Sequence, residues 1–213
     1  MKSVVSYALV FAVLATACNS AAVTSPSQVA TVASPKPIAV LGDSLSVSPS
    51  RSDGFPSILQ TRINDARLPW TVINAGVRGD TSSGGLQRLD DLLAQTPEIL
   101  ILALGANDGL RGVDVGILAR NLSEIITRTK ARGVRVLLCG METPPLHGWN
   151  YTLAFHNVFP ALAREHNVPL VPFLLAGVAL DPAMNMDDMI HPNAAGAKRI
   201  ADTVWVYVQP LIR

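Results

Sequence analysis

Short apolar runs alternate with longer amphipathic stretches along most of the chain. Between the runs, helical patterns cover residues 56–67, 83–95, 113–132, 151–166 and 192–208. The runs themselves have the pattern of strands that are buried on both faces; they are PIAVLG, WTVINAG, EILILALG, VRVLLCG and VPLVPF. This alternation predicts an α/β fold in which one parallel sheet is covered by helices on both sides.

The last helical stretch has the clearest periodicity. Its apolar residues recur at spacings of three and four, as on one face of a helix; they are Ala194, Ala197, Ile200, Ala201, Val204, Trp205 and Val208. Pro192 suits a first helical turn, because an N–H there would have no partner. We therefore expect a helix from Pro192 to Val208.

The first 17 residues have the pattern of a signal peptide. Lys2 is followed by an apolar stretch from Val4 to Ala17, which is too short to span a bilayer. The residues LATAC resemble the bacterial lipobox, in which the cysteine, here Cys18, is lipidated. An Ala-x-Ala site for ordinary secretion overlaps it. The sequence therefore predicts export, either as a periplasmic or cell-envelope lipoprotein anchored at Cys18 or as a secreted soluble protein.

Residues 18–37 are rich in Ala, Ser, Thr, Val and Pro, and this composition predicts a flexible tether before a domain at 38–213. The 213 residues are 49% hydrophobic and 15% charged, which suits one compact domain. Removal of residues 1–17 would take away one charged residue, Lys2, and leave 16 basic residues against 16 acidic ones. Nucleic-acid binding is therefore not expected. Cys139 lies in an apolar run and predicts a buried thiol rather than a disulfide. The glycine-rich stretch GVRGDTSSGG lacks the spacing of nucleotide-binding loops, so no cofactor is expected.

Polar residues follow the predicted strands at four places. They are Gly42-Asp43-Ser44, NAGVRGDTS, LGANDG and DDMIHP. Each has an ordinary explanation by itself, since such residues cap helices and form turns. Ligands of an open α/β sheet bind beyond the carboxyl ends of its strands, so we expect all four to converge on one edge. Together they supply a nucleophile, a base, an acid and amide donors.

Ser44 is the candidate nucleophile, and it needs a base to remove its proton. Of His147, His156, His166 and His191, only His191 has a carboxylate close by in the sequence, at Asp188. That spacing predicts a triad of Ser44, His191 and Asp188, with Asp43 in a structural role. The predicted donors to the oxyanion are the backbone N–H groups of Ser44 and Gly79 and the amide of Asn107. Because Ser46 replaces the second glycine of Gly-x-Ser-x-Gly, this is not an ordinary α/β-hydrolase.

Four blocks together resemble the GDSL, or SGNH, hydrolase family: GDSLS, NAGVRGDTS, GAND and DMIHP. Within it, the chain is most similar to the bacterial periplasmic acyl-CoA thioesterase, lysophospholipase and arylesterase group, from Ile38 to Ile212. The resemblance implies a flavodoxin-like three-layer α/β/α sandwich with a five-stranded parallel sheet. It also implies the triad and oxyanion residues named above and an acyl-enzyme route for carboxylic esters, extending to thioesters and lysolipids.

Two features depart from the family pattern. Arg78 stands where a small residue is expected, and METPPLHGWNYT, which shapes the acyl pocket in this group, does not match closely. Candidate substrate contacts are Arg78, Leu110 and Trp149. We hypothesise that Arg78 favours esters that carry a nearby phosphate or carboxylate.

Three alternatives remain open. One is a carbohydrate acetylesterase of the same fold. Another is a metal-dependent phosphoesterase, although such sites usually need several histidines; its ligands would come from Asp43, Asp80, Asn107, Asp108, Asp188 and His191. The third is an acyl-binding lipoprotein without catalysis. Dialysis against a chelator tests the second alternative, and labelling of Ser44 by a fluorophosphonate tests the third.

Overall fold

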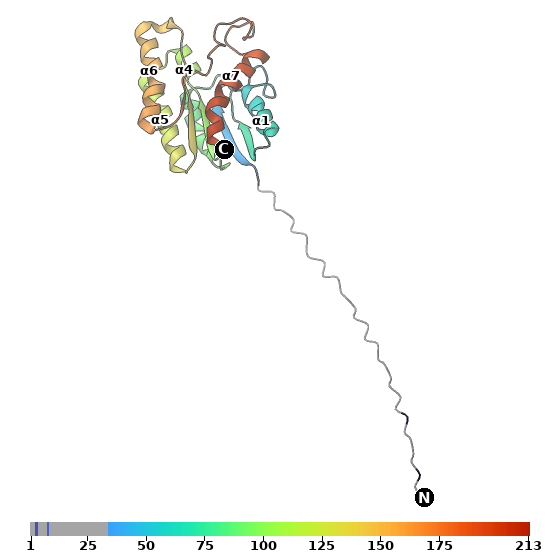
Figure 1. Ribbon diagram of the computed structural model, residues 1–213. Coiled ribbons are helices and arrows are strands. Elements are labelled where there is room, and N and C mark those ends of the chain that lie inside the picture. Colours follow the sequence, from blue (N-terminus) through green and yellow to red (C-terminus); the bar gives the residue numbers. More distant parts are fainter. Residues whose placement is uncertain (1–2, 4–7, 9–33) are drawn as a thin grey trace. The chain divides into compact units, whose positions relative to one another are not determined.

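The structure, a computed structural model, describes Ser3, Ala8 and residues 34–213 (Figure 1). The predicted signal peptide, Cys18 and the tether as far as residue 33 lie outside the described part of the chain, apart from Ser3 and Ala8. Those interpretations therefore stay predictions. No helix among the described residues is both long and apolar enough to cross a membrane.

Five parallel strands form one sheet, in the order β2-β1-β3-β4-β5. Their bounds are β1 Lys36–Gly42, β2 Trp70–Asn74, β3 Ile99–Ala103, β4 Arg135–Cys139 and β5 Leu170–Val171. The central strand β3 is buried along its whole length, as its unbroken apolar sequence predicted. From β1 the chain moves to β2 on one side and later to β3 on the other, so the order reverses between β1 and β3. Such a switch point is where α/β sheets bind ligands.

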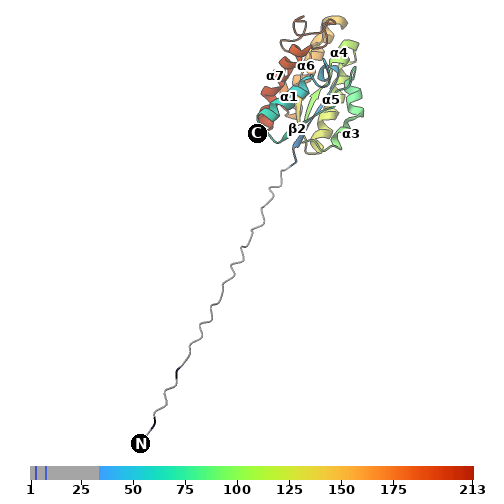
Figure 2. The same cartoon turned by 90° about the vertical axis from the view of Figure 1, so that its right-hand side faces the viewer.

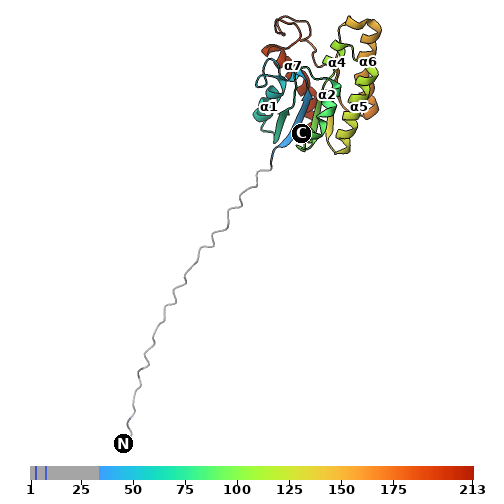
Figure 3. The ribbon, with the colours of Figure 1, turned by 180° about the vertical axis from the view of Figure 1, so that it is seen from behind.

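Helices cover both faces of the sheet, which confirms the predicted three-layer sandwich. The helix α1 (Phe55–Asp65) packs against α7 (Ala194–Val208), and α5 (Val115–Ala131) packs against both α2 (Ser82–Gln87) and α6 (Trp149–His166). Figure 2 views the sheet with α1 and α7 on one side and α5 on the other, and Figure 3 shows the same layers from behind. Between the layers lie the buried residues of the core, Cys139 among them, and burial raises the pKa of that thiol to about 12.

Three elements differ from the sequence prediction. The helix expected at 83–95 is divided into α2 and α3 (Leu89–Leu93), with Arg88 between them. The expected turn LGANDG contains a helix, α4 (Ala106–Arg111). The last helix begins at Ala194 rather than Pro192, because the side chain of Asn193 accepts the N–H groups of Ala195 and Gly196 and so caps it.

Candidate active site

The four predicted polar clusters lie at the carboxyl edge of the sheet. Ser44 begins a short 3-10 helix, η1 (Ser44–Ser46), directly after β1, and Gly79 lies in the loop after β2. Asn107 lies in α4, which follows β3. The loop between β5 and α7 carries Asp188 and His191, and Figure 1 shows it at the same end of the sheet as α4.

Ser44, His191 and Asp188 form one hydrogen-bonded array. The Oγ of Ser44 lies 2.9 Å from Nε2 of His191, and Nδ1 of His191 lies 2.6 Å from Oδ2 of Asp188. Ser44 is buried, with 7% of its surface exposed. The three side chains that the sequence singled out are therefore close enough to exchange a proton between serine and histidine.

Asp188 is held as an ionised carboxylate. Its Oδ1 accepts the backbone N–H groups of Ile190, at 3.0 Å, and His191, at 2.9 Å. The hydrogen bond from the His191 side chain and, to a smaller extent, these two backbone bonds hold the pKa of Asp188 well below its usual range. Because an ionised carboxylate only accepts, Nδ1 of His191 carries the proton when the ring is neutral. Its Nε2 then offers a lone pair to the hydroxyl of Ser44.

Asp43, rather than Ser44, is the residue that caps the turn after β1. Its Oδ1 accepts the N–H of Leu45 at 2.9 Å, which leaves the Ser44 hydroxyl to His191. Burial raises the pKa of Asp43 to about 7. Ser46 fills the space beside the turn, because a Cβ on Gly42 would lie 2.1 Å from its Oγ. The serine in place of the elbow glycine is thus accommodated by a neighbouring glycine.

Gly79 and Asn107 have the local geometry that their predicted roles need. Gly79 has φ +75°, a conformation that side chains disfavour, and its carbonyl accepts Nη2 of Arg111 at 2.9 Å. The Nδ2 of Asn107 donates to the carbonyl of Asp80 at 2.9 Å and lies 3.4 Å from Oδ2 of Asp43. The backbone and the amide are therefore held in place, while their contact with an oxyanion stays a prediction.

An apolar cavity of about 350 Å³ adjoins the array. Its walls come from η1, from α4 and from the loops after β4 and β5, and Glu142 is the one charged residue among them. The lining residues are Leu45, Ala106, Leu110, Met141, Glu142, Thr143, Pro144, Phe173, Leu175, Ala179, Leu180, Met189 and Ile190. Leu45 and Ile190 are the chain neighbours of Ser44 and His191, so the cavity opens beside the reacting groups. A cavity with this mostly apolar lining suits the acyl chain of an ester.

Of the three candidate substrate contacts, only Leu110 lines this cavity. Trp149 begins α6 and is 71% exposed. Arg78 is also exposed, and its Nη2 lies 3.4 Å from the carbonyl of Val47. Neither Trp149 nor Arg78 lines the cavity, so their roles as substrate contacts and the hypothesis about anionic esters stay predictions.

Sequence reasoning missed the outer wall of the cavity. Leu180, Met189 and Ile190 belong to the loop between β5 and α7, and all three are exposed large apolar side chains. Two apolar residues stand directly before the predicted base and follow two aspartates, Asp187 and Asp188. This signal was present in the sequence as Met189-Ile190-His191.

The other three histidines have partners elsewhere. His147 contacts the carbonyl of Leu110, His156 pairs with Glu142 and His166 contacts Ser123. Within the described residues, no group of three or more His, Cys, Asp or Glu side chains is arranged to hold a metal ion. Asp108, one of the carboxylates considered as a metal ligand, instead accepts both the N–H and the hydroxyl of Ser82.

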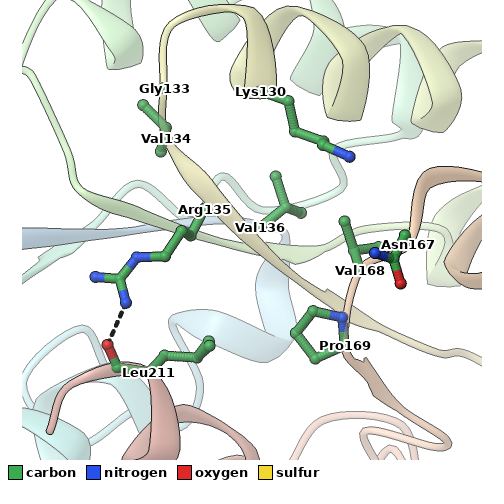
Figure 4. Close-up of a pocket in the computed structure, with 9 residues that line it drawn as sticks. All are labelled: Lys130, Gly133, Val134, Arg135, Val136, Asn167, Val168, Pro169 and Leu211. Carbon is green, nitrogen blue, oxygen red and sulfur yellow. Dashed lines mark hydrogen bonds between the residues drawn. The ribbon is translucent and has the colours of Figure 1, made fainter.

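A hollow of about 310 Å³ lies at the opposite edge of the sheet, where β4 and β5 begin (Figure 4). Its lining includes Lys130, Arg135 and Leu211, and Nη1 of Arg135 donates to the carbonyl of Leu211 at 2.5 Å. None of its lining residues is a serine, cysteine or histidine. Of these two sites, only the one at the carboxyl edge therefore has the nucleophile and base that acyl transfer needs.

Comparisons with known proteins agree with this geometry. Residues 40–199 match the model of the GDSL-like lipase/acylhydrolase family. Esterase TesA of Pseudomonas aeruginosa is 40% identical over 176 residues, which cover 81% of this chain and 88% of that protein. Thioesterase 1/protease 1/lysophospholipase L1 of Escherichia coli is 39% identical over 176 residues, covering 81% and 83%.

A solved structure is similar over the whole domain. It is the psychrotrophic esterase EstA from Pseudoalteromonas, inhibited by monoethylphosphonate, at 30% identity and a TM-score of 0.79, covering 83% of this chain and 98% of that one. The matched segment runs through all four strand-end clusters, from before Ser44 to beyond His191. The chain therefore belongs to the GDSL-like lipase/acylhydrolase family and is a serine ester hydrolase.

Proposed function

We propose that this enzyme hydrolyses small carboxylic esters by transferring the acyl group to Ser44. The observation that carries the proposal is the array in which Ser44 Oγ faces His191 Nε2 and His191 Nδ1 faces Asp188. As the serine oxygen attacks the carbonyl carbon, His191 takes its proton and Asp188 stabilises the resulting imidazolium. A tetrahedral intermediate forms, and its negative charge lies on the former carbonyl oxygen.

The intermediate collapses when its bond to the leaving alcohol breaks and His191 returns the proton to that oxygen. Ser44 N, Gly79 N and the Asn107 amide are the donors that stabilise the oxyanion in this proposal. Water then attacks the acyl-enzyme, His191 accepts a proton from the water, and the carboxylic acid leaves as Ser44 regains its proton. Each half-reaction uses the same base and the same donors.

The apolar cavity supports acyl esters, thioesters and lysolipids as substrates, because its lining can receive a hydrocarbon chain. The names of the relatives, esterase and thioesterase/lysophospholipase, include these classes. An acetylated sugar, the alternative, would use the same groups but leave the apolar wall unfilled. Acyl chain length is therefore the property that distinguishes these substrates.

The test combines labelling with a substrate series. We expect a fluorophosphonate to label one mole of Ser44 per mole of enzyme, and the rate to survive dialysis against a chelator. A series of p-nitrophenyl esters, run beside a lysophospholipid and an acetylated xylan, then ranks the leaving groups. Absence of labelling together with loss of rate on chelation would exclude the serine mechanism in favour of a metal-dependent one.

We infer that the enzyme is exported and anchored to the cell envelope through Cys18. The support is the signal-peptide pattern of residues 1–17 and the lipobox-like LATAC. Fractionation of cells expressing the natural chain and a Cys18→Ala variant tests this. Anchoring predicts that the natural chain is in the membrane fraction and the variant in the soluble periplasm. A soluble natural chain would instead support ordinary secretion.

A further inference from the structure

One guanidinium group joins the ends of two strands and the loop that follows the second of them. We propose that Arg88, acting with Asp80, is a positioning residue that sets the relative places of the three oxyanion donors. This inference deepens the proposed function and rests on it. Neither side chain lines the cavity, so both would act through other groups.

Arg88 makes three hydrogen bonds from its three nitrogens. Its Nη2 donates to the carbonyl of Gly42 at 2.9 Å and its Nη1 to the carbonyl of Ala75 at 2.5 Å. Its Nε donates to Oδ2 of Asp80 at 2.8 Å. The side chains of Arg88 and Asp80 are 24% and 10% exposed, so this pair is largely shielded from water.

The acceptors lie close in the chain to two of the donors. Gly42 ends β1 and precedes Ser44 by two residues, while Asp80 directly follows Gly79. Ala75 comes directly after β2, at the start of the loop that carries Gly79. A single planar group therefore binds the chain just before Ser44 and on both sides of Gly79.

The third donor is attached through Asp80. The carbonyl of Asp80 accepts Nδ2 of Asn107 at 2.9 Å, which orients the amide. The Asp80 carboxylate is itself fixed, since its Oδ1 accepts the N–H of Thr81 at 3.0 Å. A Cβ on Gly84 would lie 1.8 Å from that oxygen, so the carboxylate can take this place only beside a glycine. Asp80 thus connects Arg88 to Asn107, because its carboxylate accepts from the first and its carbonyl accepts from the second.

The geometry of an oxyanion hole tolerates little displacement. A shift on the order of 1 Å in a catalytic group costs about 10²-fold in rate. Lysine is a poor substitute for Arg88, because a flexible ammonium cannot bind three acceptors in the planar geometry of a guanidinium. A change at Arg88 should therefore reduce the turnover number more than it reduces binding of the ester.

The experiment compares Arg88→Lys with the matched variant Arg62→Lys. Arg62 is also 24% exposed and bonds an aspartate, Asp202, and a carbonyl, that of Ala201, but it lies on α1 and its partners lie on α7. We measure kcat and KM for p-nitrophenyl acetate, together with Tm. The expected result is a loss in kcat of about 10- to 100-fold for Arg88→Lys, with KM within about 3-fold, and no loss in kcat for Arg62→Lys.

A double-mutant cycle with Asn107→Ala then separates positioning from general stability. If Arg88 acts through the donors, part of its effect is already lost in the Asn107→Ala enzyme, and the further loss should shrink to less than about 5-fold. Added ethylguanidinium should restore part of the kcat of Arg88→Ala. Equal losses in both backgrounds, or a kcat that follows Tm alone in the Arg88 and Arg62 variants, would overturn the proposal.

Two further variants keep the outcome interpretable. If Arg88→Lys does not fold, Asp80→Asn replaces it, because that change removes the ion pair while Arg88 keeps both carbonyls. The same kcat loss and the same dependence on Asn107 are expected, and their absence refutes the proposal. Ser44→Ala serves as the reference for the proposed function: if it stays active, the serine mechanism fails, whereas an unaffected Arg88→Lys in an enzyme that needs Ser44 refutes only the positioning role.

Discussion

The Nε2 atom of His191 lies 2.9 Å from the Oγ of Ser44, although 147 residues separate the two in the chain. Ser44 follows the first strand, and His191 lies in the last loop before α7. Because all five strands run parallel, the segments that follow β1 and β5 leave the sheet at the same edge. The predictions below depend on this juxtaposition.

Replacing Ser44 by Ala should remove nearly all activity. The hydroxyl is the atom to which the acyl group is transferred, and loss of a triad nucleophile typically costs about 10⁴-fold or more in kcat. Hydrolysis of p-nitrophenyl acetate measures the effect, and circular dichroism checks that the variant is folded. A variant that retains about a tenth of the natural rate would contradict the assignment of Ser44 as the nucleophile.

Asp188→Asn should lower kcat by about 10⁴-fold while leaving the fold intact, because an amide cannot hold His191 in the same tautomer. Asp187→Asn is the matched control. Asp187 is the preceding carboxylate and is also exposed on the loop, so its change should leave kcat as it was. Similar losses in both variants would indicate that the charge of the loop, rather than the Asp188–His191 contact, matters.

Asn107→Ala should lower kcat by about 10²- to 10³-fold, the usual effect of losing one oxyanion donor, with little change in KM. Asn157→Ala, an exposed asparagine on α6, is the control for loss of an amide. Steady-state kinetics with a short ester resolves the two parameters. If Asn107→Ala raised KM and left kcat unchanged, the amide would bind the substrate in its ground state and would not stabilise the oxyanion.

Leu110→Trp should shift the preference toward shorter acyl chains, because the larger side chain fills part of the cavity that Leu110 lines. Each methylene that no longer fits should cost roughly 10-fold or more in kcat/KM. Val206→Trp, a change of similar size at an exposed position on α7, is the control. The measurement is the ratio of p-nitrophenyl octanoate to acetate turnover; an unchanged ratio in Leu110→Trp would place the acyl chain elsewhere.

Asp43 should make the stability of the enzyme depend on pH. Its pKa is raised from 3.8 to about 7 by burial, so between these values the folded protein keeps a proton that the unfolded chain has lost. The free energy of unfolding should therefore fall as pH rises through this window, by up to about 1 kcal/mol per pH unit. Urea unfolding of the natural enzyme and of Asp43→Asn, at about pH 5 and about pH 8, measures this change in the free energy of unfolding.

Asp43→Asn should lack this part of the dependence, because an amide does not titrate in that range. The difference in unfolding free energy between the two proteins should thus move in favour of the variant as pH rises. A difference that stays constant across the window would show that Asp43 does not titrate there.

Local patterns were enough to predict most elements of the fold. The unbroken apolar run at β3 and the three-and-four spacing in α7 are properties of neighbouring residues, so they are legible in the sequence. The short helix α4 was not predicted, because Asn-Asp-Gly favours a turn by itself. Its stability comes from distant contacts: Asp108 accepts from Ser82, and the hydroxyl of Tyr151 donates to the carbonyl of Val113 just beyond the helix.

The contacts of Arg88, which lies between α2 and α3, were likewise not legible in the sequence. Nothing near Arg88 in the sequence requires a break in the helix, yet its guanidinium binds the carbonyls at the ends of β1 and β2. Those acceptors become neighbours only after the sheet has formed. The exposure of Trp149 was also not legible in the sequence, since it depends on how α6 packs rather than on the residue type.

The sequence by itself determined the fold class, the order of the strand-end motifs and the residue types able to do acyl-transfer chemistry, because these depend on local periodicity and on side-chain identity. Only the tertiary structure decided the distances among Ser44, His191 and Asp188, the lining of the apolar cavity and the hydrogen bonds of Arg88. These quantities join segments far apart in the chain. They are set by how helices pack on the sheet and by which buried carbonyls need a donor, and no local pattern records either.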